Sequence, residues 1–150
     1  MRRFSWYAAV CGGLLILVGP FILWNSQTSF PTNEHPTVQI GGQVVRVDIA
    51  NTPEMREHGL SGRAGLADGE GMLFVFPEDG PHAFWMKDMR FPIDIVWLSH
   101  EWEVVDITSH VSPDTYPTAF SPQTPARYVL ELPAGFIEEH AIEIGDEAVF

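Results

Sequence analysis

The sequence has only one cysteine and only one lysine among its 150 residues. Cys11 lies near the N-terminus, so the rest of the chain can form no internal disulfide and offers no thiol nucleophile or thiolate metal ligand. The seven other basic residues are all arginine, which sets Lys87 apart. Lys87 stands between Phe84-Trp85-Met86 and Asp88, and a lysine bracketed by large apolar groups and carboxylates has a restricted setting. This segment is therefore the first candidate for a functional site.

Charged residues are absent between residues 4 and 24, directly after the basic pair Arg2 and Arg3. An apolar run of this length can cross the ~30 Å hydrocarbon core of a membrane as a helix, and the basic pair places the N-terminus in the cytoplasm. A cleaved signal peptide is the alternative, but its apolar core spans only ~7–15 residues and ends at a small-x-small site. No such site follows Trp24. We therefore expect an uncleaved transmembrane helix, with secretion after cleavage as the open alternative.

This interpretation divides the chain into three parts. Residues 1–24 are the membrane anchor or signal segment, and residues 25–37, which are polar and contain two prolines, are a linker. Residues 38–150 have the length of one domain, which we expect outside the cytoplasm, in a periplasmic or extracellular position.

Basic residues are scarce in the outer domain. Residues 31–150 hold all 20 carboxylates against six arginine and lysine side chains, a net charge of −14. A field of this sign repels nucleic acid and anionic lipid surfaces, so we expect no nucleic-acid partner. Solubility is one explanation of this negative net charge, and adaptation of the source organism to salt is another.

The apolar pattern of the domain predicts short strands. Residues 38–40 and 44–49 indicate a hairpin with Gly41-Gly42 at its turn. Asn51, Pro53 and Glu54 have the spacing of a helix start, which predicts a short helix over residues 52–58.

Further strands are expected at 72–76, 83–86, 93–98, 102–107 and 128–132, with a helical turn at 136–140 and a closing hairpin over 142–150. Four prolines make residues 108–126 a long ordered loop. The expected fold is mainly β: a compact antiparallel sandwich or barrel-like domain with one short helix, preceded by the transmembrane helix.

Motifs for common catalytic and metal chemistry are missing. The six histidines are scattered, without the spacing of a metal site, and no Gly-x-Ser-x-Gly elbow or phosphate-binding loop occurs. We therefore expect no metal and no cofactor. His110, on the proline-rich loop, is the one histidine placed to approach a pocket.

Charged side chains within apolar runs are the stronger candidates. Asp94 and Glu131 lie in predicted strands, Lys87 and Asp88 follow Trp85-Met86, and Arg63 lies in a glycine-rich turn. Because a buried charge is costly unless it is paired, we hypothesise that Arg63 or Lys87 pairs with Asp94 or Glu131. Such a cluster is either a structural ion pair or part of a ligand site.

Aromatic residues form a second constellation. Trp85, Trp97 and Trp102 fall in neighbouring predicted strands, and Tyr116 and Phe120 lie on the long loop. Core packing is one explanation. Stacking of a flat ligand such as a sugar is the other.

Several segments together identify a family. The runs Thr52-Pro53-Glu54-Met55-Arg56-Glu57-His58-Gly59-Leu60-Ser61-Gly62-Arg63, Gly71-Met72-Leu73-Phe74-Val75-Phe76, Phe84-Trp85-Met86-Lys87-Asp88, Pro92-Ile93-Asp94, Tyr128-Val129-Leu130-Glu131 and Gly145-Asp146 resemble the DUF192 (UPF0127) family. The resemblance implies a small, mostly β domain, often exported or membrane-anchored, and no known activity. Two departures stand out: the family usually has Asn-Thr where this chain has Asp88-Met89, and commonly has Met where Ser61 stands.

Two functional classes follow. The first is a binding or accessory module at the cell envelope for a glycan or small polar ligand, supported by the aromatic residues and the long loop. The second is a hydrolase or transferase-type enzyme that uses Lys87 with Asp88, Asp94 or Glu131 as acid–base groups.

Overall fold

A computed structural model of the chain describes residues 35–150. The predicted membrane segment at residues 1–24, and the linker up to residue 34, lie outside the described residues. Within residues 35–150 the helices are all too short or too polar to cross a membrane.

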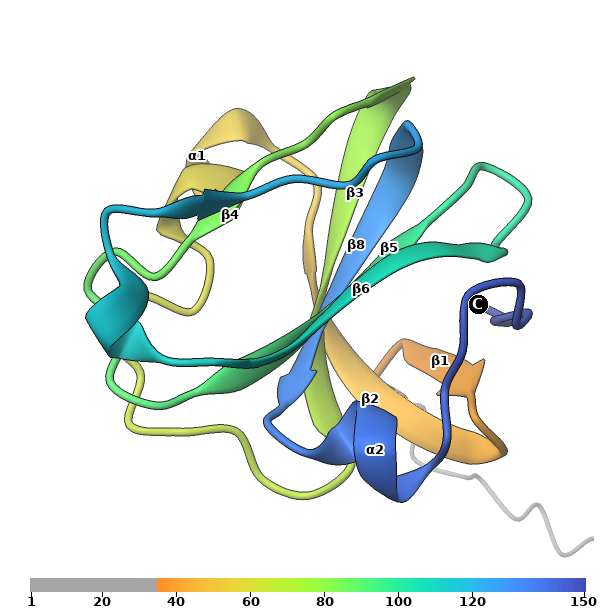
Figure 1. Cartoon of the computed structure of the whole chain (residues 1–150), viewed down its shortest axis with the longest axis horizontal. Coiled ribbons are helices and arrows are strands. Elements are labelled where there is room, and N and C mark those ends of the chain that lie inside the picture. Colours follow the sequence, from red (N-terminus) through yellow and green to blue (C-terminus); the bar gives the residue numbers. More distant parts are fainter. Residues whose placement is uncertain (1–34) are drawn as a thin grey trace, which may run out of the picture. The chain divides into compact units, whose positions relative to one another are not determined.

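The domain is built on one large mixed sheet (Figure 1). Its six strands run in the order β1-β2-β3-β8-β5-β6, with bounds β1 Thr37–Ile40, β2 Gln43–Ala50, β3 Glu70–Gly80, β8 Ala126–Pro133, β5 Ile93–Leu98 and β6 Val104–Val111. Neighbouring strands are antiparallel except β2 and β3, which are parallel. The expectation of a purely antiparallel sheet is therefore wrong. The segment between β2 and β3 carries the chain back along the sheet, as a parallel pair requires.

Short elements complete the domain. The helix α1 (Pro53–His58) connects β2 to β3, and the helix α2 (Phe136–Glu139) follows β8. The expectation of one helix is wrong, although α2 coincides with the predicted helical turn. The start of α1 also differs by one residue from the prediction, because the Thr52 hydroxyl, and not Asn51, accepts the Met55 N–H at 3.2 Å.

The proline-rich segment is less of a loop than expected. β6 continues to Val111, a short 3-10 helix covers Pro113–Thr115, and β7 (Ala119–Phe120) pairs with β4 (Phe84–Trp85). The two-stranded pair β4 and β7, called the ribbon below, lies apart from the main sheet.

The C-terminal segment forms no hairpin, so that prediction is wrong. Instead it lies against both outer parts of the sheet: Gln39 of β1 and Val149 exchange hydrogen bonds of 2.7 and 2.9 Å, and the Ala148 N–H donates to the Trp102 carbonyl at 2.8 Å. Across residues 35–150 the sheet remains open between β1 and β6, and is not a closed barrel.

Apolar side chains cover both faces of the sheet. One cluster gathers α2 and the C-terminal segment, with Leu130 and Leu132 of β8. The other gathers the loop after α1, the ribbon and Val129 of β8. Because side chains alternate along a strand, Glu131 points to the same face as Val129. A carboxyl group is thereby placed in the middle of the second apolar face.

Candidate functional site

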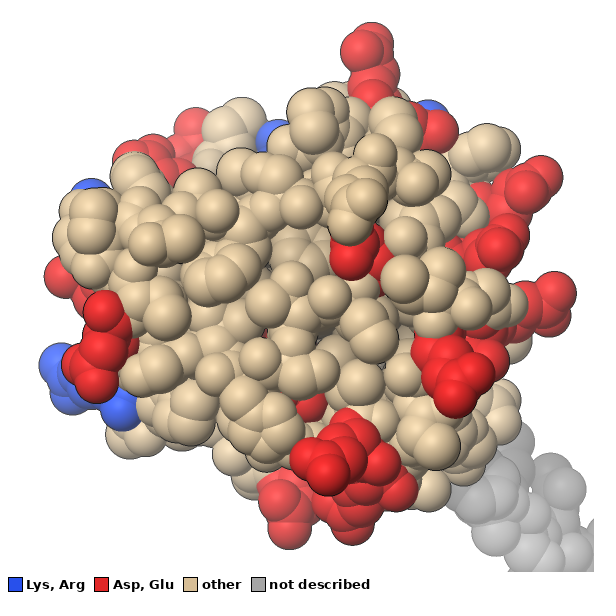
Figure 2. Space-filling view, in the orientation of Figure 1, with Lys and Arg blue, Asp and Glu red and all other residues tan. Residues whose placement is uncertain are grey.

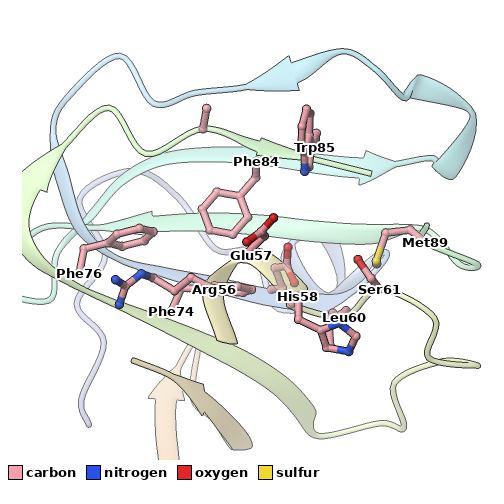
Figure 3. A pocket seen from close by; sticks show the side chains of 13 residues that line it. Arg56, Glu57, His58, Leu60, Ser61, Phe74, Phe76, Phe84, Trp85 and Met89 are labelled. Atoms are coloured by element: carbon pink, nitrogen blue, oxygen red, sulfur yellow. The ribbon is translucent and has the colours of Figure 1, made fainter. Parts of the chain in front are cut away.

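A pocket opens on this second face, between α1 and the ribbon (Figure 3). Its volume is about 300 Å³. Its lining comes from residues 56–61 of α1 and the following loop, Phe74 and Phe76 of β3, residues 83–85, Met89 and Glu131. The size is at the lower end of what small-molecule sites offer.

Aromatic rings form the wall of the pocket. Phe84 projects from the ribbon towards α1 and β3 (Figure 3), with its ring edge-on to Phe74 at 4.7 Å and to Phe76 at 6.4 Å between centroids. Trp85 is half exposed, and its ring lies 5.8 Å from the equally exposed Tyr116. The pocket thus combines an aromatic wall with polar side chains from α1 and the loop that follows it.

Glu131 is the polar group of the interior. It is paired in the sheet with Met72 of β3 and Ile95 of β5 and is only 5% exposed. Its Oε2 atom has no hydrogen-bond partner within residues 35–150. Burial raises the pKa of this carboxyl to about 8, although the Arg63 guanidinium acts in the opposite direction. Glu131 is therefore mainly protonated at pH 7.

The charged residues at the pocket belong to α1. The Arg56 guanidinium donates to the Val75 carbonyl at 2.8 Å and lies 5.1 Å from the centre of the Phe76 ring. Glu57 and His58 are exposed. These two contacts fix the Arg56 side chain in the wall of the pocket, with its guanidinium hydrogen-bonded to the backbone of β3.

Asp94 is fully buried, but it does not take part in the pocket. Its carboxylate accepts the backbone N–H groups of His110 at 2.7 Å, Gly135 at 3.0 Å and Ile137 at 2.9 Å. It joins β6 to the start of α2. The predicted ion pair of Asp94 with Arg63 or Lys87 is not formed in the part of the chain that the structure describes. The backbone donors compensate this carboxylate without a cation.

The two basic candidates lie elsewhere. Arg63 binds Asp48 at 2.8 Å, and both side chains are substantially exposed. Lys87 is exposed, with its Nζ 6.0 Å from the Trp85 ring, and lines a shallow depression beside the pocket together with Asp88. Neither forms an ion pair with Glu131 among residues 35–150, so the predicted cluster is not assembled.

Of the predicted residues, Trp85 and Glu131 line the pocket. His110 does not line it, and its backbone N–H donates a hydrogen bond to Asp94. The sequence did not single out Phe74, Phe76 and Phe84 as pocket-lining residues, because their apolar runs also fit an ordinary core. No three His, Cys, Asp or Glu side chains converge as a metal site anywhere in residues 35–150.

The face seen in Figure 2 carries acidic side chains mainly along its lower and right-hand margins, with few basic groups. This distribution agrees with the excess of carboxylates in the sequence.

The fold defines a small, mainly β domain with an open mixed sheet and an aromatic pocket. Residues 36–150 match the DUF192 family, described as an uncharacterised ACR, and the chain belongs to that family. The UPF0127 protein PF1050 of Pyrococcus furiosus is 40% identical over 80 residues, which are 50% of this chain and 63% of that protein. The matched stretch thus spans less than two thirds of the relative.

Two crystal structures have the same fold. A protein of unknown function from Novosphingobium aromaticivorans has a TM-score of 0.72 and 28% identity, over 76% of this chain and 84% of its own. A candidate transcription regulator from Sinorhizobium meliloti 1021 has a TM-score of 0.71 and 30% identity, over 75% of this chain and 91% of its own.

Proposed function

We propose that this protein is a binding module at the cell envelope and that it holds a small ligand in the pocket between α1 and the ribbon. One observation carries the proposal: an aromatic-walled cavity of about 300 Å³ has a single unpartnered carboxyl in its interior. Ligand sites are mostly apolar, with a few polar groups that fix orientation. The position at the envelope is supported by the uncharged run near the N-terminus.

The rim supports a flat or ring-shaped ligand. Trp85 lines the pocket and is half exposed, and the exposed Tyr116 ring lies 5.8 Å from it, so a sugar ring or another planar group can stack on Trp85. Phe84 would contact the part of the ligand that enters.

Other roles have weaker support. An enzyme that uses Lys87 with neighbouring carboxylates could not use Asp94 as an acid–base group, because the Asp94 oxygens already accept backbone N–H groups. The name of the Sinorhizobium structure refers to transcription, but the excess of carboxylates in this chain disfavours contact with a phosphate backbone.

The test is a ligand-observed NMR titration of the full chain with cell-wall glycan fragments and small ring-bearing compounds. Compounds that bind should lose about ten-fold or more in affinity with Trp85→Ala, since stacking on an aromatic ring contributes roughly 1–3 kcal/mol. The control is Phe150→Ala, which removes an equally exposed ring stacked on Trp102 and outside the pocket. Absence of binding by every compound, or equal binding by the two variants, would refute the proposal.

A further inference from the structure

We infer that the ligand of this pocket carries a positively charged amine, which enters the pocket and forms an ion pair with Glu131. The inference rests on the proposed function, and it specifies the chemical class of the ligand.

The first argument is the unfilled hydrogen-bonding capacity of Glu131. Its side chain is about nineteen-twentieths buried, and its Oε2 lacks a partner within residues 35–150. A buried carboxylate without a partner is unfavourable, so Glu131 is mainly protonated in the free protein, and a charged donor relieves this penalty by pairing with the ionised form. The nearby cations are committed: Arg56 donates to the Val75 carbonyl, and Arg63 binds Asp48. Within residues 35–150 the Glu131 Oε2 atom therefore remains available to a donor group on the ligand.

The second argument is the chemistry of the wall. Aromatic faces attract cations, and the attraction is stronger where water is excluded. Phe74 and Phe84 meet at 4.7 Å and line the same cavity as Glu131. Aromatic rings in the same cavity as Glu131 favour a cation over an anion or a polar neutral group.

The third argument is the surrounding charge. Glu57 is at the mouth, and the domain as a whole has a large excess of carboxylates. This field attracts small cations and repels carboxylates and phosphates.

Proton release provides a signature of this ion pair. Arg56, Glu57 and His58 of α1 are the other titratable groups that line the pocket with Glu131, and the charge of Arg63 in the following loop acts to lower the pKa of Glu131. The strands β3 and β5 contribute only apolar side chains beside it.

Because burial raises the pKa of Glu131 to about 8, an ammonium that enters at pH 7 must displace the carboxyl proton. The affinity for the ammonium ligand should therefore rise about ten-fold per pH unit up to about pH 8. The affinity for a neutral ligand should show no such rise.

The experiment compares benzylamine with benzyl alcohol, its neutral counterpart, on the full chain. Isothermal titration calorimetry at pH 6, 7 and 8, in two buffers of different ionisation enthalpy, measures affinity and the protons released. We expect benzylamine to bind about ten-fold more tightly at pH 7 than at pH 6 and to release close to one proton, while benzyl alcohol binds independently of pH. This measurement uses the unmodified protein, so it does not depend on a variant that folds.

A pair of variants locates the charge. Glu131→Gln should abolish the preference for benzylamine and keep the binding of benzyl alcohol, whereas Glu101→Gln, at an exposed position outside the pocket, should change affinity less than about three-fold. Equal binding of amine and alcohol, or amine binding without proton release, would overturn the inference and leave the binding module intact. Failure of both compounds to bind would count against the module and the inference together.

Discussion

The Ser61 hydroxyl donates a hydrogen bond of 2.9 Å to the backbone carbonyl of Lys87. Next to it, the Gly62 N–H donates to the Asp88 carbonyl, also at 2.9 Å. These two bonds join the loop after α1 to the loop after β4. Since Ser61 and Trp85 both line the pocket, the bonds fix the distance between its two sides.

Removal of the Ser61 hydroxyl should loosen this connection. Ser61→Ala should lower the free energy of unfolding by about 1 kcal/mol, the typical contribution of one hydrogen bond, as measured by urea denaturation. Ser121→Ala is the matched control, since Ser121 is an exposed serine. Its effect should stay within about 0.5 kcal/mol. Equal stability of both variants and the parent would show that the hydroxyl contributes nothing.

Asp88 occupies a backbone conformation that few residues adopt. Its φ is 55°, in the left-handed region, where asparagine, aspartate and glycine are favoured. Aspartate and asparagine both meet this backbone requirement, so aspartate can stand here although the family resemblance implies asparagine at this position. Asp88→Asn should leave stability unchanged, whereas Asp88→Val should lower it by about 1–2 kcal/mol. Thermal unfolding of the two variants checks this, and similar melting temperatures would contradict it.

Asp94 should be the most sensitive carboxylate of the domain. Asp94→Asn replaces an oxygen that accepts backbone N–H groups with an NH2 group that cannot, and should cost about 3 kcal/mol or more of unfolding free energy. Asp68→Asn, at an exposed position, should be nearly neutral. Urea denaturation of both distinguishes a hydrogen-bonding role from a general effect of charge. A loss below about 1 kcal/mol for Asp94→Asn would contradict the role assigned to this carboxylate.

Glu131 should make the domain less stable as pH rises. Its pKa is about 8 in the folded protein against an ordinary value of 4.5, so unfolding releases a proton between these pH values. The stabilisation contributed by Glu131 is therefore fully present below pH 4.5 and is lost as pH rises to about 8, by an amount on the order of a few kcal/mol.

Glu131→Gln is neutral at every pH and should lack this decrease. Urea denaturation at pH 5, 7 and 9 should show a variant that gains stability over the parent as pH increases. The exposed Glu57→Gln should follow the parent. Parallel curves for Glu131→Gln and the parent would mean that the carboxyl titrates normally in the folded protein.

Much of the secondary structure could be predicted because burial imposes a pattern on the sequence. Val45 and Val47 alternate with exposed residues in β2, and every residue of β5 is buried, as its apolar run, interrupted only by Asp94, indicates. The pairing of strands is different. Nothing in the apolar runs of β2 and β3 identifies them as parallel neighbours, because the same side chains fit either direction.

The site was predictable only in part. Trp85 and Glu131 stand out as unusual residues in their segments, and both line the pocket. Asp94 stands out for the same reason, yet the donors that compensate it are backbone N–H groups, two of them more than 40 residues away. A sequence pattern shows which charges need a partner. It does not show that main-chain groups supply one.

The division of the pocket between a large sheet and a small ribbon affects how its specificity can evolve. Glu131 stands in the central strand, where a substitution disturbs neighbours on both sides. Trp85 belongs to a strand of two residues, and its half-exposed side chain is less embedded in the core. Under the proposed binding function, mutations on the ribbon would alter the shape of the accepted ligand while the fold persists. The sheet would then serve as a scaffold whose selectivity is changed from the ribbon side.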